Sequence, residues 1–380
     1  MAIRRKNFGL QVVVALSIIM TIVYFLVPIP SPTNTPLTTA DTTTTAIEKQ
    51  SVKAAFVILA RNSDLDGVRQ SVRQMEDRFN RKFNYPYVFL NDDDFDEEFK
   101  ELTTSLTKAK TFYGKIDESQ WSFPSFIDQE RAKQTRIKMA EQGIIYGDSV
   151  SYRHMCRYQS GFFFRHPLLD EYEYYWRIEP DINYYCDVDY DVFQMMKDND
   201  YQYGWTMSLT EYRETIPTLW ETTQEFMKLH PEYIVEGKDS LKPFLTDNNF
   251  QNYNGCHFWS NFEIGSLEFL RSKKYMDYFE YLDQAGGFFY ERWGDAPVHS
   301  IAVALMLRKD QVHFFNDIGY FHNPLTHCPT ERYLHKNCHC NADTNFDWQG
   351  WSCASRYKKV DPNFIWDEET YKNKTSPYRI

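Results

Sequence analysis

Residues 54–94, "AAFVILARNSDLDGVRQSVRQMEDRFNRKFNYPYVFLNDDD", decide the fold of this chain. The run "AAFVILARN" is apolar and ends in polar residues, as a buried strand does, and "YPYVFLNDDD" repeats this pattern with acid after Leu90. Between the two runs, apolar side chains are spaced 3, 4, 3 and 4 residues apart, at Leu65, Val68, Val72, Met75 and Phe79. This spacing predicts a helix, whose first turn Ser63 or Asp64 can cap. Strand, helix and strand of these lengths predict a right-handed parallel crossover and an α/β fold.

The same topology predicts where a ligand binds. In sheets of parallel strands, ligands lie beyond the carboxyl ends of the strands. Arg61, Asn62 and Asp64 directly follow the first strand and therefore mark a candidate nucleotide-binding edge. Further strands are predicted at residues 174–178, 203–209 and 312–315, and further helices at 128–142, 217–229, 267–282 and 297–307. Because no linker or internal repeat is visible after residue 51, we expect residues 51–380 to form one domain.

The first 50 residues are expected to lie outside that domain. Residues 8–27, "FGLQVVVALSIIMTIVYFLV", carry no charge and are long enough to span ~30 Å of hydrocarbon. The length of this run and the "PIPSP" that follows favour an uncleaved signal anchor over a cleaved signal peptide, and the basic residues at positions 4–6 predict that residues 1–7 lie in the cytosol. Residues 28–50 are rich in Pro and Thr and are typical of an extended stalk. The domain at 51–380 would then be luminal, as in single-pass type II membrane enzymes of the Golgi.

Charge and cysteine content narrow the class of protein further. The net charge is −11 and no basic block follows position 6, which argues against nucleic acid as a partner. Seven cysteines suit an oxidising compartment, where disulfides are the expected state. A zinc site is the alternative for the late cysteines, because His327, His335 and His339 lie among them. The odd total leaves a free thiol, and Cys186 is interpreted as a small buried side chain.

Five carboxylates fall within residues 179–191 of "YYWRIEPDINYYCDVDYD". Glu179 and Asp181 flank a proline that ends a predicted strand, and an extended backbone would point both carboxylates to one side. Two converging oxygens suit Mg²⁺ or Mn²⁺, which can neutralise a diphosphate leaving group. A solvated acidic turn is the alternative. Asp187, Asp189 and Asp191 are interpreted as helix caps and turn residues.

Two later stretches carry further candidates. Glu263 lies among large apolar residues in "CHFWSNFEIG", which suits either a structural acid with internal hydrogen bonds or a group tuned for catalysis. In "ERWGDAPVHS", Asp295 is interpreted as a helix N-cap ahead of Pro297. The alternative for this second stretch is acceptor binding by Arg292, Trp293 or Asp295.

Three stretches together carry a family resemblance: "YYWRIEPDINYYCDVDYDVF", "CHFWSNFEIGSLEFLRSKKYMDYFEYLDQAGGFFYERWGDAPVHS" and "HFFNDIGYFHNP". They closely resemble the fungal Golgi α-1,2-mannosyltransferases of the Kre2/Mnt1 (KTR) group, glycosyltransferase family 15, and the similarity runs through nearly all of residues 51–360. The resemblance implies a mixed α/β fold of the GT-A type, GDP-mannose as donor and Mn²⁺ as cofactor. The implied reaction transfers mannose to the 2-hydroxyl of a mannose on an N- or O-linked glycan with retention of anomeric configuration.

The resemblance also implies roles for single residues. Glu179 matches a metal ligand, with Asp181 beside it in a metal or ribose role, and His322 matches a late metal-contacting histidine. Glu263 matches the acid proposed as nucleophile, and Tyr152 a tyrosine close to the phosphate and sugar of the donor. Retention requires either a covalent glycosyl intermediate or attack on the face that the diphosphate leaves. The residues do not decide between these routes.

Two other functions remain open at this point. Transfer of mannosyl phosphate by the same site would use the same motifs. A luminal lectin or chaperone on the same fold would be expected to lack Glu179 or Glu263, and both are present.

Overall fold

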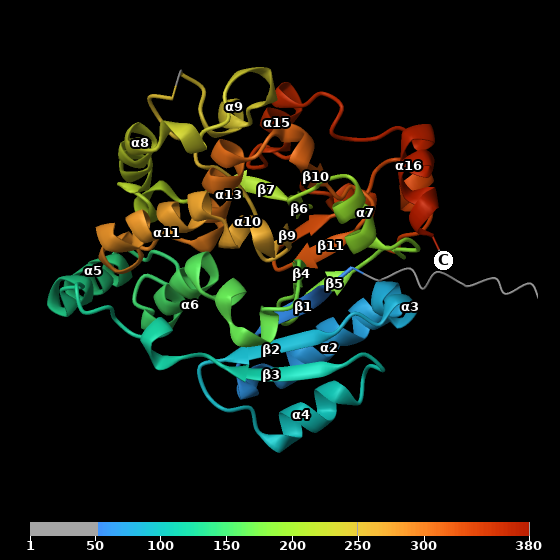
Figure 1. Cartoon of the computed structure of the whole chain (residues 1–380), viewed down its shortest axis with the longest axis horizontal. Helices are drawn as coiled ribbons and strands as arrows, with labels where there is room; N and C mark the ends of the chain where they lie inside the picture. Colours follow the sequence, from blue (N-terminus) through green and yellow to red (C-terminus); the bar gives the residue numbers. More distant parts are fainter. Residues whose placement is uncertain (1–51, 249, 380) are drawn as a thin grey trace, which may run out of the picture. The chain divides into compact units, whose positions relative to one another are not determined.

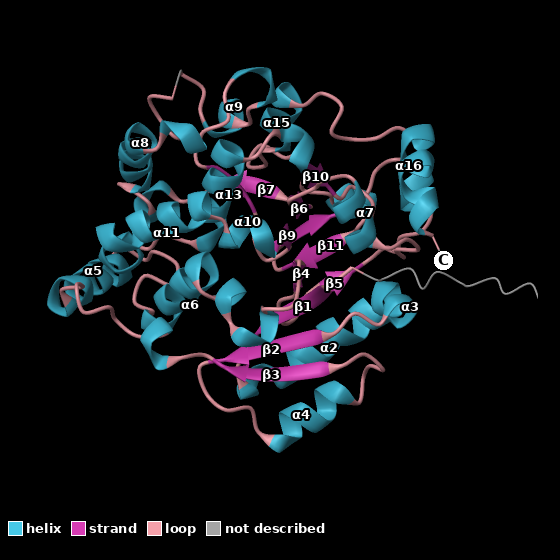
Figure 2. Cartoon of the chain, in the orientation of Figure 1, coloured by secondary structure: helices cyan, strands magenta, loops and turns pink. Residues whose placement is uncertain are grey.

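The computed structural model describes residues 52–248 and 250–379 and is organised around one seven-stranded sheet (Figures 1 and 2). The strands lie in the order β10-β6-β9-β4-β1-β2-β3. Their bounds are β1 Ala54–Leu59, β2 Tyr87–Asn91, β3 Thr111–Lys115, β4 Tyr174–Arg177, β6 Tyr203–Trp205, β9 Ile264–Ser266 and β10 Val312–Phe314. The strands run parallel except β9, which is antiparallel to its neighbours β4 and β6. The parallel pairing of β1 with β2 confirms the predicted α/β crossover.

Two smaller sheets and a set of helices surround the main sheet (Figure 1). One small sheet contains β5 Asn183–Tyr184, β11 Tyr320–His322 and β12 Leu325–His327, and the other pairs β7 Ser208–Thr210 with β8 Cys256–Phe258. The helices up to residue 245 are α2 Leu65–Met75, α3 Arg81–Phe83, α4 Glu97–Thr104, α5 Gln129–Glu141, α6 Val150–Gly161, α7 Val192–Asp198, α8 Leu219–Leu229 and α9 Lys242–Leu245. Those that follow are α10 Leu267–Arg271, α11 Lys273–Ala285, α12 Gly287–Tyr290, α13 Asp295–Met306, α14 Arg332–His335, α15 Ala354–Val360 and α16 Glu368–Thr375.

Both faces of the sheet are buried, as the near-continuous apolar run of β1 predicts. Phe56 and Ile58 belong to one apolar cluster together with side chains of α2 and α7. Ala55 and Val57 belong to a second cluster with side chains of α6, α11 and α13. Alternate side chains of one strand therefore anchor helices on opposite faces, which fixes the edge at which the strands end.

Several predicted elements differ in their bounds. The predicted helix at 267–282 is interrupted at Ser272, whose extended backbone ends α10 while its hydroxyl accepts a hydrogen bond from the backbone N–H of Tyr275 in α11. The predicted strand at 203–209 splits, because β7 leaves the main sheet to pair with β8. Gly294, not Asp295, is the N-cap of α13, and Asp295 is its first helical residue. This position frees the Asp295 carboxylate from capping.

The cysteines form three disulfides, Cys186–Cys338, Cys256–Cys353 and Cys328–Cys340. The predicted disulfide state is thus confirmed. The interpretation of Cys186 as a simple buried side chain is wrong, because its partner lies 152 residues away in sequence and no local pattern announces it. The zinc alternative is excluded for these cysteines, since an oxidised sulfur is not a thiolate ligand. The free thiol is Cys156, which is buried in α6.

In the described residues, no helix has both the length and the apolar character that a membrane crossing needs. The predicted cytosolic tail, anchor and stalk at 1–50 fall outside the described residues, so this part of the prediction stays open.

Candidate active site

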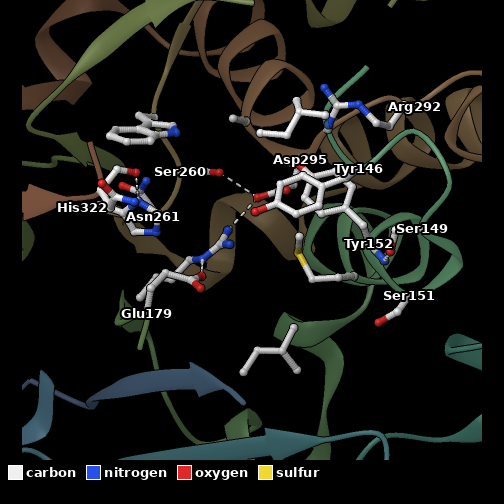
Figure 3. A pocket seen from close by; sticks show the side chains of 18 of the residues that line it. Tyr146, Ser149, Ser151, Tyr152, Glu179, Ser260, Asn261, Arg292, Asp295 and His322 are labelled. Atoms are coloured by element: carbon white, nitrogen blue, oxygen red, sulfur yellow. Dashed lines mark hydrogen bonds and ion pairs between the residues drawn. The ribbon is translucent and has the colours of Figure 1, made fainter. Parts of the chain in front are cut away.

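A cavity of about 800 Å³ opens at the carboxyl edge of the main sheet. Its walls include the ends of β1, β2 and β4, which meet here because parallel strands end at one edge. The N-terminal turns of α6 and α13, the turn between β11 and β12, and residues in and next to β7 and β8 also line it. Figure 3 shows Glu179 and His322 on one side of this cavity and Tyr152 and Arg292 on the other.

Glu179 and His322 line the cavity and form its candidate metal site. Glu179 follows β4, and its Oε1 accepts a hydrogen bond of 2.6 Å from Arg177 Nε. His322 ends β11, and burial lowers the pKa of its imidazole, which keeps a ring nitrogen free of its proton for coordination. Within 52–248 and 250–379, no cluster of three Asp, Glu, His or Cys ligand atoms includes either residue. In the part of the chain that the structure describes, Glu179 and His322 are therefore the candidate protein ligands, and a substrate or water would complete the coordination.

Asp181 lies outside the lining of this cavity. Its backbone is left-handed, with φ 60°, so the chain turns after Pro180 and the expectation that both carboxylates lean to one side is wrong. The Asp181 carboxylate instead lies against α2, where a Cβ on Gly67 would come within 2.7 Å of Oδ1. It is exposed and does not line the cavity. Its carboxylate is still near enough to His322 to raise the pKa of that imidazole, and a metal or ribose role for Asp181 stays a prediction.

The remaining acids of the opening cluster have structural partners. Asp191 is the N-cap of α7 and accepts a hydrogen bond from the backbone of Gln194, as predicted. Asp187 forms an ion pair of 2.6 Å with Arg78, and Asp189 pairs with Arg379 near the C-terminus. These two acids form surface ion pairs and do not cap a helix.

A buried cation lies at the centre of the site. Arg177, the last residue of β4, donates from Nη1 to Oδ2 of Asp295 at 2.6 Å. Its Nε donates the hydrogen bond to Glu179 described above. Ser260 Oγ donates to the same Asp295 oxygen at 2.7 Å (Figure 3). Burial by itself would raise the pKa of Asp295, but the charges of Arg177 and His299 and the hydrogen bonds from Ser260 and Arg177 together outweigh it and leave the pKa below its usual value. Asp295, which lines the cavity, is therefore an ionised carboxylate at neutral pH.

Glu263 lies beneath the cavity rather than in its wall. Its side chain is 0% exposed, and the residue precedes β9. Tyr175 and Tyr203 donate to its carboxylate at 2.9 and 3.0 Å, and His299 Nδ1 lies 3.0 Å away. Burial lowers the pKa of His299, but the charge and hydrogen bond of Glu263 together with the charge of Asp295 outweigh burial, so the net pKa is above the ordinary value. Three donors thus surround the Glu263 carboxylate. This geometry matches the interpretation of Glu263 as a structural acid with internal hydrogen bonds.

Aromatic and basic side chains form the opposite wall of the cavity. The Tyr152 ring stacks on Tyr146 with centroids 4.5 Å apart, and the Arg292 guanidinium lies 5.1 Å from its centroid. Burial raises the pKa of Tyr152 well above its usual value, so its hydroxyl remains a neutral donor. Arg61 Nη2 donates to Ser151 Oγ, which joins the end of β1 to α6. All of these residues line the cavity.

Three residues selected from the sequence, Asp181, Glu263 and Trp293, do not line the cavity, and several residues that line it were not selected. Trp293 is 1% exposed and donates to Glu291, so it lies behind the wall rather than in it. Arg177, Ser260 and Glu211 line the cavity and were not selected from the sequence. Only Arg177 carried a signal, as a cation inside an otherwise apolar predicted strand.

A family model and curated relatives match most of this chain. A family model described as "Glycolipid 2-alpha-mannosyltransferase" matches residues 30–362. "Glycolipid 2-alpha-mannosyltransferase 2" of Candida albicans is 57% identical over 314 residues, which cover 82% of this chain and 68% of that protein. "Alpha-1,2 mannosyltransferase KTR1" of Saccharomyces cerevisiae is 53% identical over 311 residues, covering 81% and 79%.

Solved structures agree with these matches. Core-mannan synthase A from Aspergillus fumigatus, in its Mn/GDP form, is similar with a TM-score of 0.77 and 39% identity, covering 88% of this chain and 93% of that one. The mannosyltransferase Ktr4p from S. cerevisiae in complex with GDP gives a TM-score of 0.78 and 37% identity, covering 97% and 95%.

Proposed function

This chain belongs to the glycolipid 2-alpha-mannosyltransferase family, and from that premise we propose its reaction and its site. It is a GDP-mannose-dependent α-1,2-mannosyltransferase, a glycosyltransferase of the GT-A type. It transfers mannose to the 2-hydroxyl of a mannose on the glycans of glycoproteins. The observation that carries this assignment is the cavity at the carboxyl edge of the sheet, where Glu179, His322 and Asp295 come together from three distant segments.

We place the enzyme in the Golgi membrane, with the catalytic domain in the lumen. The apolar segment at 8–27 supports a single membrane anchor, and three disulfides support an oxidising compartment. Mannose-terminated glycans, N-linked or O-linked, are the expected partners.

The donor is proposed to lie between the end of β1 and the candidate metal site. Arg61 offers a guanidinium to the anionic nucleotide, and the neutral hydroxyl of Tyr152 offers a hydrogen bond to the phosphate or sugar. Glu179 and His322 fit a manganese ion, because a carboxylate oxygen and a neutral imidazole nitrogen are ligands that it accepts. When bound, the ion neutralises the charge of the departing diphosphate.

Asp295 is the carboxylate that we assign to the reacting sugar. Arg177 and Ser260 hold it ionised in the cavity wall, where it can stabilise positive charge at the anomeric carbon or act as a nucleophile. Glu263, which the family resemblance assigned as nucleophile, has no exposed surface and is surrounded by donors. Since His299 lies one helical turn after Asp295 in α13, Glu263 positions this helix and through it the Asp295 carboxylate.

The test is transfer itself. The purified full-length protein is incubated with GDP-mannose, Mn²⁺ and methyl α-mannoside, and the product is analysed for its linkage. An α-1,2-linked, uncharged disaccharide is expected. A product carrying a phosphodiester would show mannosyl phosphate transfer instead, and no product from folded protein that binds GDP would reject the assignment.

A further inference from the structure

Two large aromatic side chains line the cavity although much of their surface is exposed. Tyr212 is 44% exposed and Trp351 is 41% exposed, and their ring centroids lie 5.8 Å apart at an interplanar angle of 66°. Side chains of this size are usually largely buried. Exposed apolar rings that continue the wall of a ligand cavity indicate that a ligand covers them.

The fold holds these rings on a fixed surface. The Trp351 carbonyl accepts a hydrogen bond from Thr210 N at 3.3 Å, so residue 351 lies beside β7. Two residues later, Cys353 N donates to Ser208 O at 3.0 Å and its sulfur is bonded to Cys256 in β8. The segment that carries Trp351 is therefore attached to the β7–β8 sheet by hydrogen bonds and by a covalent bond. A preorganised platform costs little ordering when a ligand binds.

The platform lies on the acceptor side of the proposed reaction centre. Glu211, the residue before Tyr212, lines the cavity with its carboxylate 3.9 Å from Arg292 Nη2. It also borders the start of α13, since a Cβ on Gly294 would lie 3.8 Å from Glu211 Oε2. The rings of Tyr212 and Trp351 therefore adjoin the part of the cavity wall that holds Asp295, whereas the proposed nucleotide-binding edge lies at the end of β1 in the main sheet.

We propose that Trp351 and Tyr212 form an outer acceptor subsite that binds the sugar next to the reacting mannose, so that the enzyme prefers a chain of at least two mannose units over a single one. The proposal rests on the proposed function. A pyranose ring presents C–H groups on its faces and hydroxyls around its rim. Its faces therefore suit an aromatic ring, and its rim suits polar neighbours such as Glu211.

The test compares two acceptors, methyl α-mannoside and the methyl glycoside of α-1,2-linked mannobiose, with GDP-mannose and Mn²⁺. The wild-type full-length protein is expected to give the higher kcat/KM with the disaccharide. Trp351→Ala and Tyr212→Ala should each lower the ratio of the two kcat/KM values by about fivefold to tenfold, because remote binding energy is lost only for the longer acceptor. Trp351→Phe, which keeps an aromatic face, should recover most of the ratio.

Trp348 provides a matched control on the same segment. It is 45% exposed, but it lies 5.7 Å from the Lys358 ammonium and does not line the cavity. Trp348→Ala should leave the ratio at its wild-type value. A ratio unchanged in both Trp351→Ala and Tyr212→Ala, or lowered equally in Trp348→Ala, would overturn the proposal. Failure of the wild type to use either acceptor would instead reject the proposed function, so the two failures are distinguishable.

Discussion

Replacing Asp295 by Asn tests whether Asp295, rather than Glu263, is the buried carboxylate that acts on the reacting sugar. Arg177 Nη1 and Ser260 Oγ both donate to Oδ2 of Asp295, and the amide oxygen of Asn can accept both bonds. The buried Arg177 nevertheless loses one of its two anionic partners, and removing one partner of a buried ion pair costs about 3–5 kcal/mol. We expect the free energy of unfolding to fall by about that amount. Circular dichroism checks that the variant is folded before its turnover is compared with that of the wild type.

Turnover of the folded Asp295→Asn variant should also fall. Removing a preorganised charge next to developing charge in a cavity costs on the order of 10²- to 10³-fold in kcat. We therefore expect Asp295→Asn to lower kcat with methyl α-mannoside by about that factor. GDP binding in Mn²⁺, measured by calorimetry, should change little, because Asp295 is not among the groups assigned to the nucleotide or the metal.

The substitution Glu263→Gln is the control for Asp295→Asn, because it neutralises the other buried carboxylate. Two tyrosine hydroxyls and His299 face the Glu263 carboxylate, and Gln offers one oxygen and a donor in its place. Stability in urea should fall by about 2–4 kcal/mol, because at least one buried donor loses its acceptor. Turnover per folded molecule should stay within about tenfold of the wild type, since Glu263 acts through position. The assignment fails if folded Glu263→Gln binds GDP but loses turnover while Asp295→Asn retains it.

Three further results are expected. Glu179→Gln should weaken GDP binding in Mn²⁺ by at least about tenfold but not in a chelator, whereas Asp181→Asn should leave both unchanged; calorimetry with and without EDTA measures this. Replacing Cys256 and Cys353 by Ser should lower the free energy of unfolding by about 4 kcal/mol, because the disulfide closes a loop of 97 residues, and urea titration of variant and wild type tests it. Burial lowers the pKa of His327, but its carboxylate partner at 2.8 Å raises it more, to a net value above normal. The stability it contributes is present below the unfolded pKa of about 6.5 and is lost as pH rises through the folded pKa, so His327→Gln should destabilise more at pH 6 than at pH 9 in urea titrations.

The sequence predicted well those features that depend on local pattern. The helix stripe from Leu65 to Phe79 and the apolar runs on either side specify the parallel crossover, because period and length are properties of contiguous residues. The positions of Glu179 at a strand end and of Asp191 at a helix start follow from the same kind of signal. Strand ends in a parallel sheet share one edge, so part of the cavity wall was predictable as well.

Features that depend on distant partners could not be predicted in this way. Asp181 turns away because its own backbone becomes left-handed after a proline, and an extended chain was the simpler expectation. Arg177 reaches Asp295, 118 residues later, only because β4 and α13 meet at the sheet edge. Glu263 reads identically in sequence whether it faces a cavity or is enclosed by Tyr175 and Tyr203.

The disulfides have a consequence for how the chain is completed during synthesis. Each of them takes at least one cysteine from residues 328–353, so Cys186 and Cys256 have no native partner until most of the chain has been made. In an oxidising compartment, waiting thiols exchange with other disulfides through mixed intermediates. A chain that stops before Cys338 would therefore keep free thiols next to β5 and in β8. The native disulfides can form only once the C-terminal tail has been made, so this tail governs when the rest of the chain becomes covalently closed.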